Sequence, residues 1–156
     1  MSIAEGQKAP DFTLPASGGR TVSLKSLKGK PFVLYFYPKA DTPGCTKEAC
    51  AFEEALPQLG HIGVTVIGVS KDEMKPIEKF AAKYNLTFPL ASDPETTTIE
   101  AYGAWQEKSM YGKKYLGIER STVLVDKTGK IAKIWPKVKV EGHAAEVLKA
   151  VQELKA

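Results

Sequence analysis

The fold is decided by the run Pro31-Phe-Val-Leu-Tyr-Phe-Tyr37, together with the later run Val64-Thr-Val-Ile-Gly-Val69. Each run carries apolar side chains at both odd and even positions. That pattern is typical of a strand whose two faces are both buried, as happens at the centre of a sheet covered by helices. We therefore expect a three-layer α/β domain with these two strands near its middle.

The neighbouring segments supply the rest of such a domain. Three more runs rich in β-branched and aromatic residues predict strands at Thr21–Leu24, Ser121–Val125 and Ile131–Trp135. The tetrapeptide Asp126-Lys-Thr-Gly129 is typical of a hairpin turn, so the last two strands are expected to be antiparallel. Apolar residues at helical spacing predict amphipathic helices over Thr46–Leu59, Lys75–Tyr84 and Ala144–Leu154.

One stretch of the chain shows no clear periodicity in the spacing of its apolar residues. Residues Ala104–Arg120 are expected to form a long loop or a short helix before the Ser121 strand. Loops of that length inside a compact domain often carry function. Trp105 and Trp135 are expected to be packing residues or to line the rim of a pocket.

Composition limits the class of protein. The chain has 156 residues, of which 43% are hydrophobic, so residues 1–156 are expected to form one domain with one core. The net charge is +4, but the lysines are scattered among acids, which argues against binding to nucleic acid. No apolar run resembles a secretory signal or approaches the about 20 residues of a membrane span. We expect a cytoplasmic protein without a membrane partner.

The two cysteines are the first candidates for chemistry. Cytosolic thiols are normally kept reduced, so a disulfide in that compartment tends to be transient rather than structural. No CxxC or HxxxH spacing is present, and His61 and His143 each lie beside a glycine in an expected loop or helix start. A metal site is therefore not expected. No GxGxxG run follows a strand, and no cofactor is expected.

The segment FYPKADTPGCTKEAC, residues 36–50, leaves a buried strand and opens a helix. Cys45 falls at the start of that helix, where unpaired N–H groups and the helix dipole favour an anion such as a thiolate. Thr42 can supply a hydroxyl donor, Pro38 and Pro43 restrict the loop, and Gly44 allows a close approach of its backbone. Each of these has an ordinary alternative, such as an N-cap for Thr42 or a strand stop for the prolines. Their occurrence together with two cysteines favours a catalytic site.

Pro38, Thr42 and Cys45 match the PxxxTxxC signature of peroxiredoxins, and the string YPKADTPGCTKEAC resembles the bacterioferritin-comigratory, or Q-type, subfamily. The later strings YGKKYLGIERSTVLVDKTGKI and WPKVKVEGHAAEVL are also similar to that family, so the resemblance extends from Ala9 to Leu148. It implies a thioredoxin-like fold with a central mixed sheet and helices on both faces.

The resemblance also implies roles for individual residues. Cys45 would be the peroxidatic nucleophile, Cys50 the resolving thiol, Thr42 a hydrogen-bond donor and Pro38 a shield of the pocket, while Arg120 would face Cys45. The implied activity is thiol-dependent reduction of hydrogen peroxide and organic hydroperoxides by a monomer, with thioredoxin or a similar dithiol as the reductant.

A physical argument explains why an arginine beside Cys45 would speed the reaction. A free thiol of pKa about 8.5 is already a few per cent thiolate at pH 7, so complete ionisation gains only about 30-fold in rate. The larger part of a fast reaction must come from donors fixed around the peroxide as charge builds on its leaving oxygen. Arg120, the Thr42 hydroxyl and the N–H groups of the Cys45 turn are the candidates. The alternative for Arg120 is a surface ion pair with Glu119 or another acid.

Two other functions fit a cysteine pair on this fold. One is a thiol–disulfide oxidoreductase acting on protein disulfides, although its usual motif is CxxC and the spacing here is CxxxxC. The other is a redox-sensing binding protein, which would be oxidised stoichiometrically and would not turn over.

Overall fold

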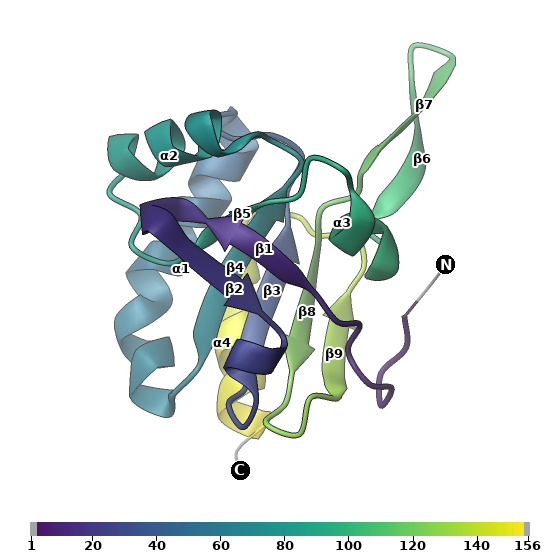
Figure 1. The fold of residues 1–156 in the computed structure, drawn as a ribbon. Coiled ribbons are helices and arrows are strands. Elements are labelled where there is room, and N and C mark those ends of the chain that lie inside the picture. The colour runs from purple at the N-terminus through teal and green to yellow at the C-terminus, as the bar shows by residue number, and fades with distance from the viewer. Residues whose placement is uncertain (1–2, 155–156) are drawn as a thin grey trace.

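A computed structural model describes residues 3–154, and its framework is a seven-stranded sheet (Figure 1). The strand order is β2-β1-β5-β4-β3-β8-β9. Strands β3, β4 and β5 run parallel to one another, whereas β8 is antiparallel to β3 and to β9, and β1 is antiparallel to β2 and to β5. The strands are β1 (Thr13–Ala16), β2 (Arg20–Ser23), β3 (Phe32–Phe36), β4 (Thr65–Ser70), β5 (Leu90–Ser92), β8 (Ser121–Val125) and β9 (Ile131–Trp135).

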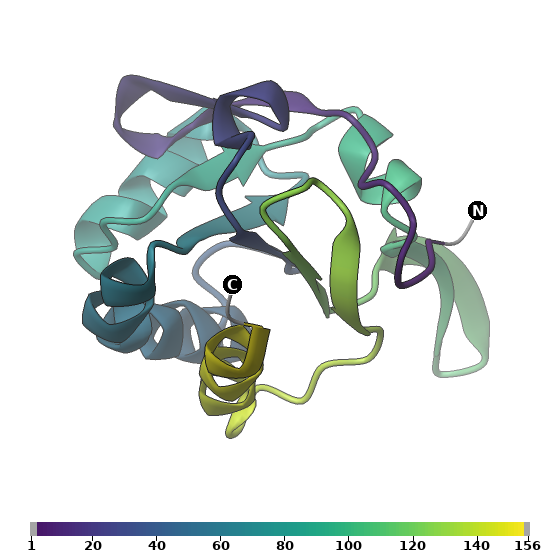
Figure 2. The same ribbon diagram turned by 90° about the horizontal axis from the view of Figure 1, so that it is seen from below.

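Helices cover both faces of this sheet, but unequally. The helices are α1 (Pro43–Ile62), α2 (Met74–Lys83), α3 (Thr97–Ala101) and α4 (His143–Leu154), with single 3-10 turns at Ser17–Gly19 and Lys25–Leu27. Side chains of α1, α2 and α4 share one buried cluster with one face of β3. The short α3 and the N-terminal segment share a second cluster with the opposite face. Figure 2 shows α1 and α4 lying beside each other on the first face. The expected mixed sheet with helices on both faces is confirmed.

The two central strands behave as their sequence predicts. All five residues of β3 are buried, and five of the six residues of β4 are buried as well. Gly68 in β4 is needed for close packing, because a Cβ atom there would lie 2.8 Å from the Tyr35 ring of β3. The Tyr35 ring in turn stacks on Phe52 of α1, with 4.7 Å between the ring centroids. This stack attaches the middle of α1 to the centre of the sheet.

The prediction for Ala104–Arg120 is wrong. This stretch forms a two-stranded antiparallel hairpin, β6 (Trp105–Met110) and β7 (Lys113–Ile118), which projects from the body of the protein (Figure 1). Its turn places Tyr111 at φ 52° and Gly112 at φ 79°, the pair of positive values that a tight two-residue hairpin turn requires. Much of β7 is exposed, so its sequence lacks the apolar alternation by which strands are recognised.

The other predicted strands and helices agree with the structure to within a few residues at each end. Strands β1 and β5 and helix α3 were not predicted. The turn at Asp126–Gly129 is confirmed, since the Gly129 N–H donates to the Asp126 carbonyl at 3.0 Å between β8 and β9. No helix within residues 3–154 is long and apolar enough to span a bilayer.

Candidate active site

The site begins where β3 ends and α1 starts. Thr42 is the N-cap of α1, with extended backbone (φ −96°, ψ 157°), and Pro43 occupies the first helical position. Proline is favoured there because its missing N–H would have no helical partner. The Thr46 N–H closes the first helical turn on the Thr42 carbonyl at 2.8 Å. Cys45 therefore lies in the first turn, on the buried face, with 1% of its surface exposed.

Hydrogen bonds from α2 and the β4–α2 loop hold the segment that precedes this helix. Asp41 has an unfavourable positive φ of 61°, and its carboxylate accepts bonds from Lys83 Nζ at 3.1 Å and the Tyr84 hydroxyl at 3.0 Å. The Ala40 N–H donates to Asp72 Oδ2 at 2.8 Å. These contacts fix the path of the chain into α1.

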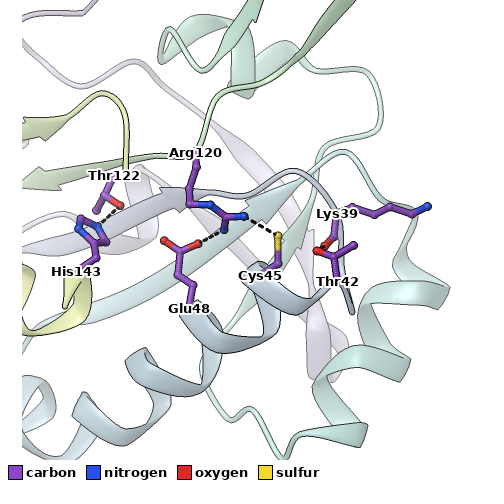
Figure 3. A network of polar contacts seen from close by, with 7 residues as sticks. All are labelled: Lys39, Thr42, Cys45, Glu48, Arg120, Thr122 and His143. Carbon is purple, nitrogen blue, oxygen red and sulfur yellow. Dashed lines mark hydrogen bonds and ion pairs between the residues drawn. The ribbon is translucent and has the colours of Figure 1, made fainter. Parts of the chain in front are cut away.

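Arg120 connects Cys45 to a buried acid (Figure 3). Its Nη2 atom lies 3.4 Å from Cys45 Sγ, and its Nη1 atom lies 2.6 Å from Glu48 Oε1. Arg120 directly precedes β8, and its carbonyl accepts a bond from the Val138 N–H at 2.8 Å, so the sheet side of the protein anchors it. Burial alone would lower the pKa of Arg120, but Glu48 and Cys45 outweigh burial and raise it. The predicted approach of Arg120 to Cys45 is present.

The acid partner of Arg120 is Glu48 rather than Glu119, and sequence reasoning missed it. The Glu48 side chain is only 2% exposed, and its second oxygen, Oε2, is buried without a hydrogen-bond partner among the described residues. Burial raises the pKa of this carboxyl to about 7, although Arg120 acts in the opposite direction. A signal was present in the sequence, because Glu48 shares the helical spacing of Cys45 and Phe52 on the buried face of α1.

The other predicted site residues surround this pair in different ways. A Cβ atom on Gly44 would lie 3.3 Å from Arg120 Nη2, so the absence of a side chain makes room for the guanidinium. The Thr42 hydroxyl donates to the Lys39 carbonyl at 2.8 Å, so its hydrogen does not point to the Cys45 sulfur, while its lone pairs can still accept a bond. Pro38, two residues after β3, is half-buried.

Cys50 lies on the same continuous helix as Cys45, is partly exposed, and is a free thiol like Cys45. Burial raises the pKa of the Cys50 thiol, and Glu54 and Glu53 raise it further. Five residues of ideal helix separate two Cα atoms by about 8.6 Å, whereas a disulfide needs about 4.4–6.8 Å. The two cysteines cannot be joined while this part of α1 remains helical.

A second polar contact lies beside the site. The buried Thr122 hydroxyl and His143 Nε2 are 2.8 Å apart, which links β8 to the first residue of α4 (Figure 3). Burial lowers the pKa of His143, so the ring is neutral at pH 7. The His143 ring packs edge to face on Phe52 of α1 and on Trp135 of β9, at 6.0 and 5.6 Å between centroids. Within residues 3–154 no group of three or more His, Cys, Asp or Glu side chains could hold a metal ion.

Comparison with known proteins places this geometry in a family. Residues 5–134 match the model of the AhpC/TSA family. The chain is 57% identical to a putative peroxiredoxin bcp of Coxiella burnetii, over 95% of this chain and 98% of that one. It is 47% identical to peroxiredoxin Bcp of Bacillus subtilis, over 99% and 98% of the two chains.

Solved structures agree with these sequence matches. PrxQ of Xylella fastidiosa superposes with a TM-score of 0.93 at 39% identity, covering 99% of this chain and 98% of that one. A structure reporting on alkyl peroxide reduction by the bacterioferritin comigratory protein of Xanthomonas campestris gives a TM-score of 0.91 at 41% identity, covering 97% and 99% of the two chains. This likeness confirms the thioredoxin-like fold. The chain belongs to the AhpC/TSA family, and within that family it is a peroxiredoxin of the Bcp, or PrxQ, group.

Proposed function

We propose that this peroxiredoxin reduces hydrogen peroxide and organic hydroperoxides with Cys45 as its nucleophile and Cys50 as its resolving thiol. The observation that carries the assignment is the contact of Arg120 Nη2 with Cys45 Sγ, at 3.4 Å in the first turn of α1. A guanidinium and the free N–H groups of a helix start both favour a thiolate over a thiol. Among residues 3–154 no arginine contacts Cys50 in this way, and burial and nearby acids raise the pKa of the Cys50 thiol, which keeps it protonated at pH 7.

In the first step the Cys45 thiolate attacks the terminal oxygen of the hydroperoxide R–O–OH. An S–O bond forms, the O–O bond breaks, and RO⁻ leaves and takes up a proton to give water or an alcohol. Arg120 can donate to the oxygens as charge builds on the leaving group. The Thr42 hydroxyl donates its own hydrogen to the Lys39 carbonyl, so its oxygen can accept a hydrogen bond from the peroxide O–H. Pro38, which is half-buried two residues after β3, is the candidate shield of the bound peroxide.

In the second step the Cys50 thiolate attacks the sulfur of the Cys45 sulfenic acid. An S–S bond forms and hydroxide leaves as water. Because the intact helix keeps the two Cα atoms too far apart, the first turns of α1 must unwind before this bond forms. An external dithiol, for which thioredoxin is our candidate, then reduces the disulfide and the helix re-forms. A cytoplasmic location suits this cycle, since that compartment supplies reduced dithiols, and a monomer suffices because both cysteines are on one chain.

The test is a coupled assay that follows peroxide loss with thioredoxin, thioredoxin reductase and NADPH. The native protein is expected to turn over many times. Cys45→Ser should abolish activity, and Cys50→Ser should consume about one equivalent of peroxide and then stop. Turnover by Cys45→Ser would overturn the assignment of the nucleophile. Stoichiometric oxidation of the native protein without turnover would favour a redox sensor instead of an enzyme.

A further inference from the structure

The buried acid of the site lies between the two cysteines in the chain. Glu48 follows Cys45 by three residues and precedes Cys50 by two, so any unwinding that brings Cys50 to Cys45 must move Glu48. Its partner, Arg120, belongs to the sheet side of the protein and does not unwind with α1. Opening of the helix therefore separates Glu48 from Arg120 and transfers the Glu48 carboxylate from a buried position to water.

Two opposite effects follow from that transfer. Opening costs the ion pair, which is short at 2.6 Å. It also relieves a carboxylate that is 98% withdrawn from solvent and whose Oε2 atom has no hydrogen-bond partner among residues 3–154. When a buried charge is only half satisfied, its desolvation penalty can exceed the attraction of its partner. The unpartnered oxygen indicates that the desolvation penalty is the larger effect here.

We propose that Glu48 controls the opening of α1: its buried carboxylate makes the closed helix less stable, and so speeds attack by Cys50 and limits overoxidation of Cys45. The inference rests on the proposed roles of the two cysteines. A sulfenic acid that stays in the closed helix remains exposed to a second peroxide, which would convert it to sulfinic acid. Faster opening shortens that exposure.

The raised pKa of Glu48 supports the same conclusion, that the ionised carboxylate makes the closed helix less stable. Burial raises the pKa from an ordinary 4.5 to about 7 in the closed helix. Protonated Glu48 therefore stabilises the closed form below pH 4.5, and this stabilisation is lost as the pH rises through about 7. Opening should become easier across that window and should change little above it.

Other ionisable groups near this carboxyl do not account for the same window. They come from β3 and the residue that follows it, from the residue before β8 and from α1 itself: Tyr35 and Tyr37, Arg120, and Cys45. Burial raises the pKa of both tyrosines, so they stay neutral, and the raised pKa of Arg120 keeps it charged. Cys45 is already a sulfenic acid when resolution begins. His143 of α4 lies near Arg120 and burial lowers its pKa, but it is present in the native and Glu48→Gln proteins alike, so its titration is common to both.

The test compares native protein with Glu48→Gln, which copies the size and neutrality of the protonated acid. Lys47→Gln is the matched control, because it changes a charge in the same segment on an exposed side chain. The rate of disulfide formation after one equivalent of peroxide is measured from pH 5.5 to 8 for each protein. Ionisation of the Cys50 thiol makes the rate depend on pH in all three proteins. Dividing the native rate by the Glu48→Gln rate removes this shared dependence and leaves the effect of residue 48.

We expect that ratio to rise by at least about tenfold between pH 5.5 and pH 8, because the closed form is protonated up to about pH 7 whereas the open form ionises near 4.5. Glu48→Gln should also be overoxidised at lower peroxide concentration at pH 8, and Lys47→Gln should match the native protein. A ratio that does not change with pH, or faster resolution by Glu48→Gln, would overturn the proposal, since the latter would show that the ion pair holds the helix closed.

A second measurement needs no peroxide and so separates this inference from the proposed function. Amide hydrogen exchange across residues 45–50 is compared in the reduced native and Glu48→Gln proteins at both pH values. Greater protection in Glu48→Gln, by a factor that is larger at pH 8 than at pH 5.5, supports the inference even if Cys45 proves not to be the nucleophile. Equal protection at both pH values refutes it while leaving the peroxidase assignment untouched.

Discussion

Replacement of Arg120 by alanine tests the electrostatics of the site most directly. The change removes the Nη2 contact to Cys45 Sγ at 3.4 Å and the Nη1 contact to Glu48 Oε1 at 2.6 Å. Any effect that acts only through the amount of thiolate is limited to about 30-fold at pH 7, because a free thiol is already a few per cent ionised. Loss of a donor to developing charge costs about 10²–10³ in rate. We therefore expect peroxide reduction to slow by well over 100-fold.

The cost in stability should be smaller than the loss in activity suggests. Arg120→Ala leaves Glu48 buried without a counter-charge, which costs several kcal/mol for a carboxylate that stays ionised. The Glu48 carboxyl already has a pKa of about 7, so it can take up a proton near neutral pH. Because the native acid is already about half protonated at pH 7, complete protonation adds less than about 1 kcal/mol to the fall in unfolding free energy, and the variant should remain folded.

Two measurements on the same variant separate the possible causes. The rate of alkylation of Cys45 against pH gives the fraction of thiolate, and stopped-flow mixing with peroxide gives the rate of oxidation. Arg120→Lys is the companion variant, since one ammonium cannot reproduce the planar fork that contacts both Cys45 and Glu48, and it should recover only part of the rate. If the loss of rate follows the loss of thiolate alone, Arg120 has no role in the transition state and the reasoning is refuted.

Three further predictions concern neighbouring features. Gly44→Ala places a Cβ atom 3.3 Å from Arg120 Nη2 and should slow peroxide reduction several-fold. Thermal stability should hold or rise, because alanine favours a helix by about 1 kcal/mol over glycine. An unchanged rate would mean that the position of the guanidinium is not critical. Amide exchange over residues 45–55 should be much faster in the disulfide form than in the reduced form, and equal protection would contradict unwinding of α1. Thr122→Val deprives the buried His143 Nε2 of its partner and should lower the urea unfolding free energy by about 1–3 kcal/mol, with Thr122→Ser as the control; equal stability of the valine and serine variants would show that this contact contributes nothing.

Much of this fold was predictable because its central strands are buried on both faces. The runs around Val33 and Ile67 are apolar at both odd and even positions and contain no charged residue, and the helical period of α1 is clear from Ala49 to Leu59. The hairpin of β6 and β7 was not predictable in the same way. Its sequence is governed by the turn at Tyr111–Gly112 and by pairing between its own strands, and not by burial against the core.

The site residues also differ in how far the sequence could predict them. Cys45, Thr42 and Pro38 lie in one short motif, so their proximity follows from the sequence. Arg120 lies 75 residues beyond Cys45, and only the resemblance to a family predicted that the two would meet. Glu48 escaped prediction because an acid within an amphipathic helix is usually solvent-facing, and its burial depends on a partner brought in from another part of the chain.

The packing of His143 between Phe52 and Trp135 gives the protein an optical reporter of its own cycle. Trp135 is one of only two tryptophans, and its ring is in edge contact with His143, which is in edge contact with Phe52 of α1. The emission of an indole depends on the groups that touch it and on its access to water. Unwinding that reaches Phe52 would loosen His143 and change the fluorescence of Trp135 without any added label. Comparison with Trp135→Phe, which leaves only Trp105, packed against the cluster on the opposite face of the sheet, would assign the signal. Each oxidation and reduction step could then be timed in a stopped-flow instrument.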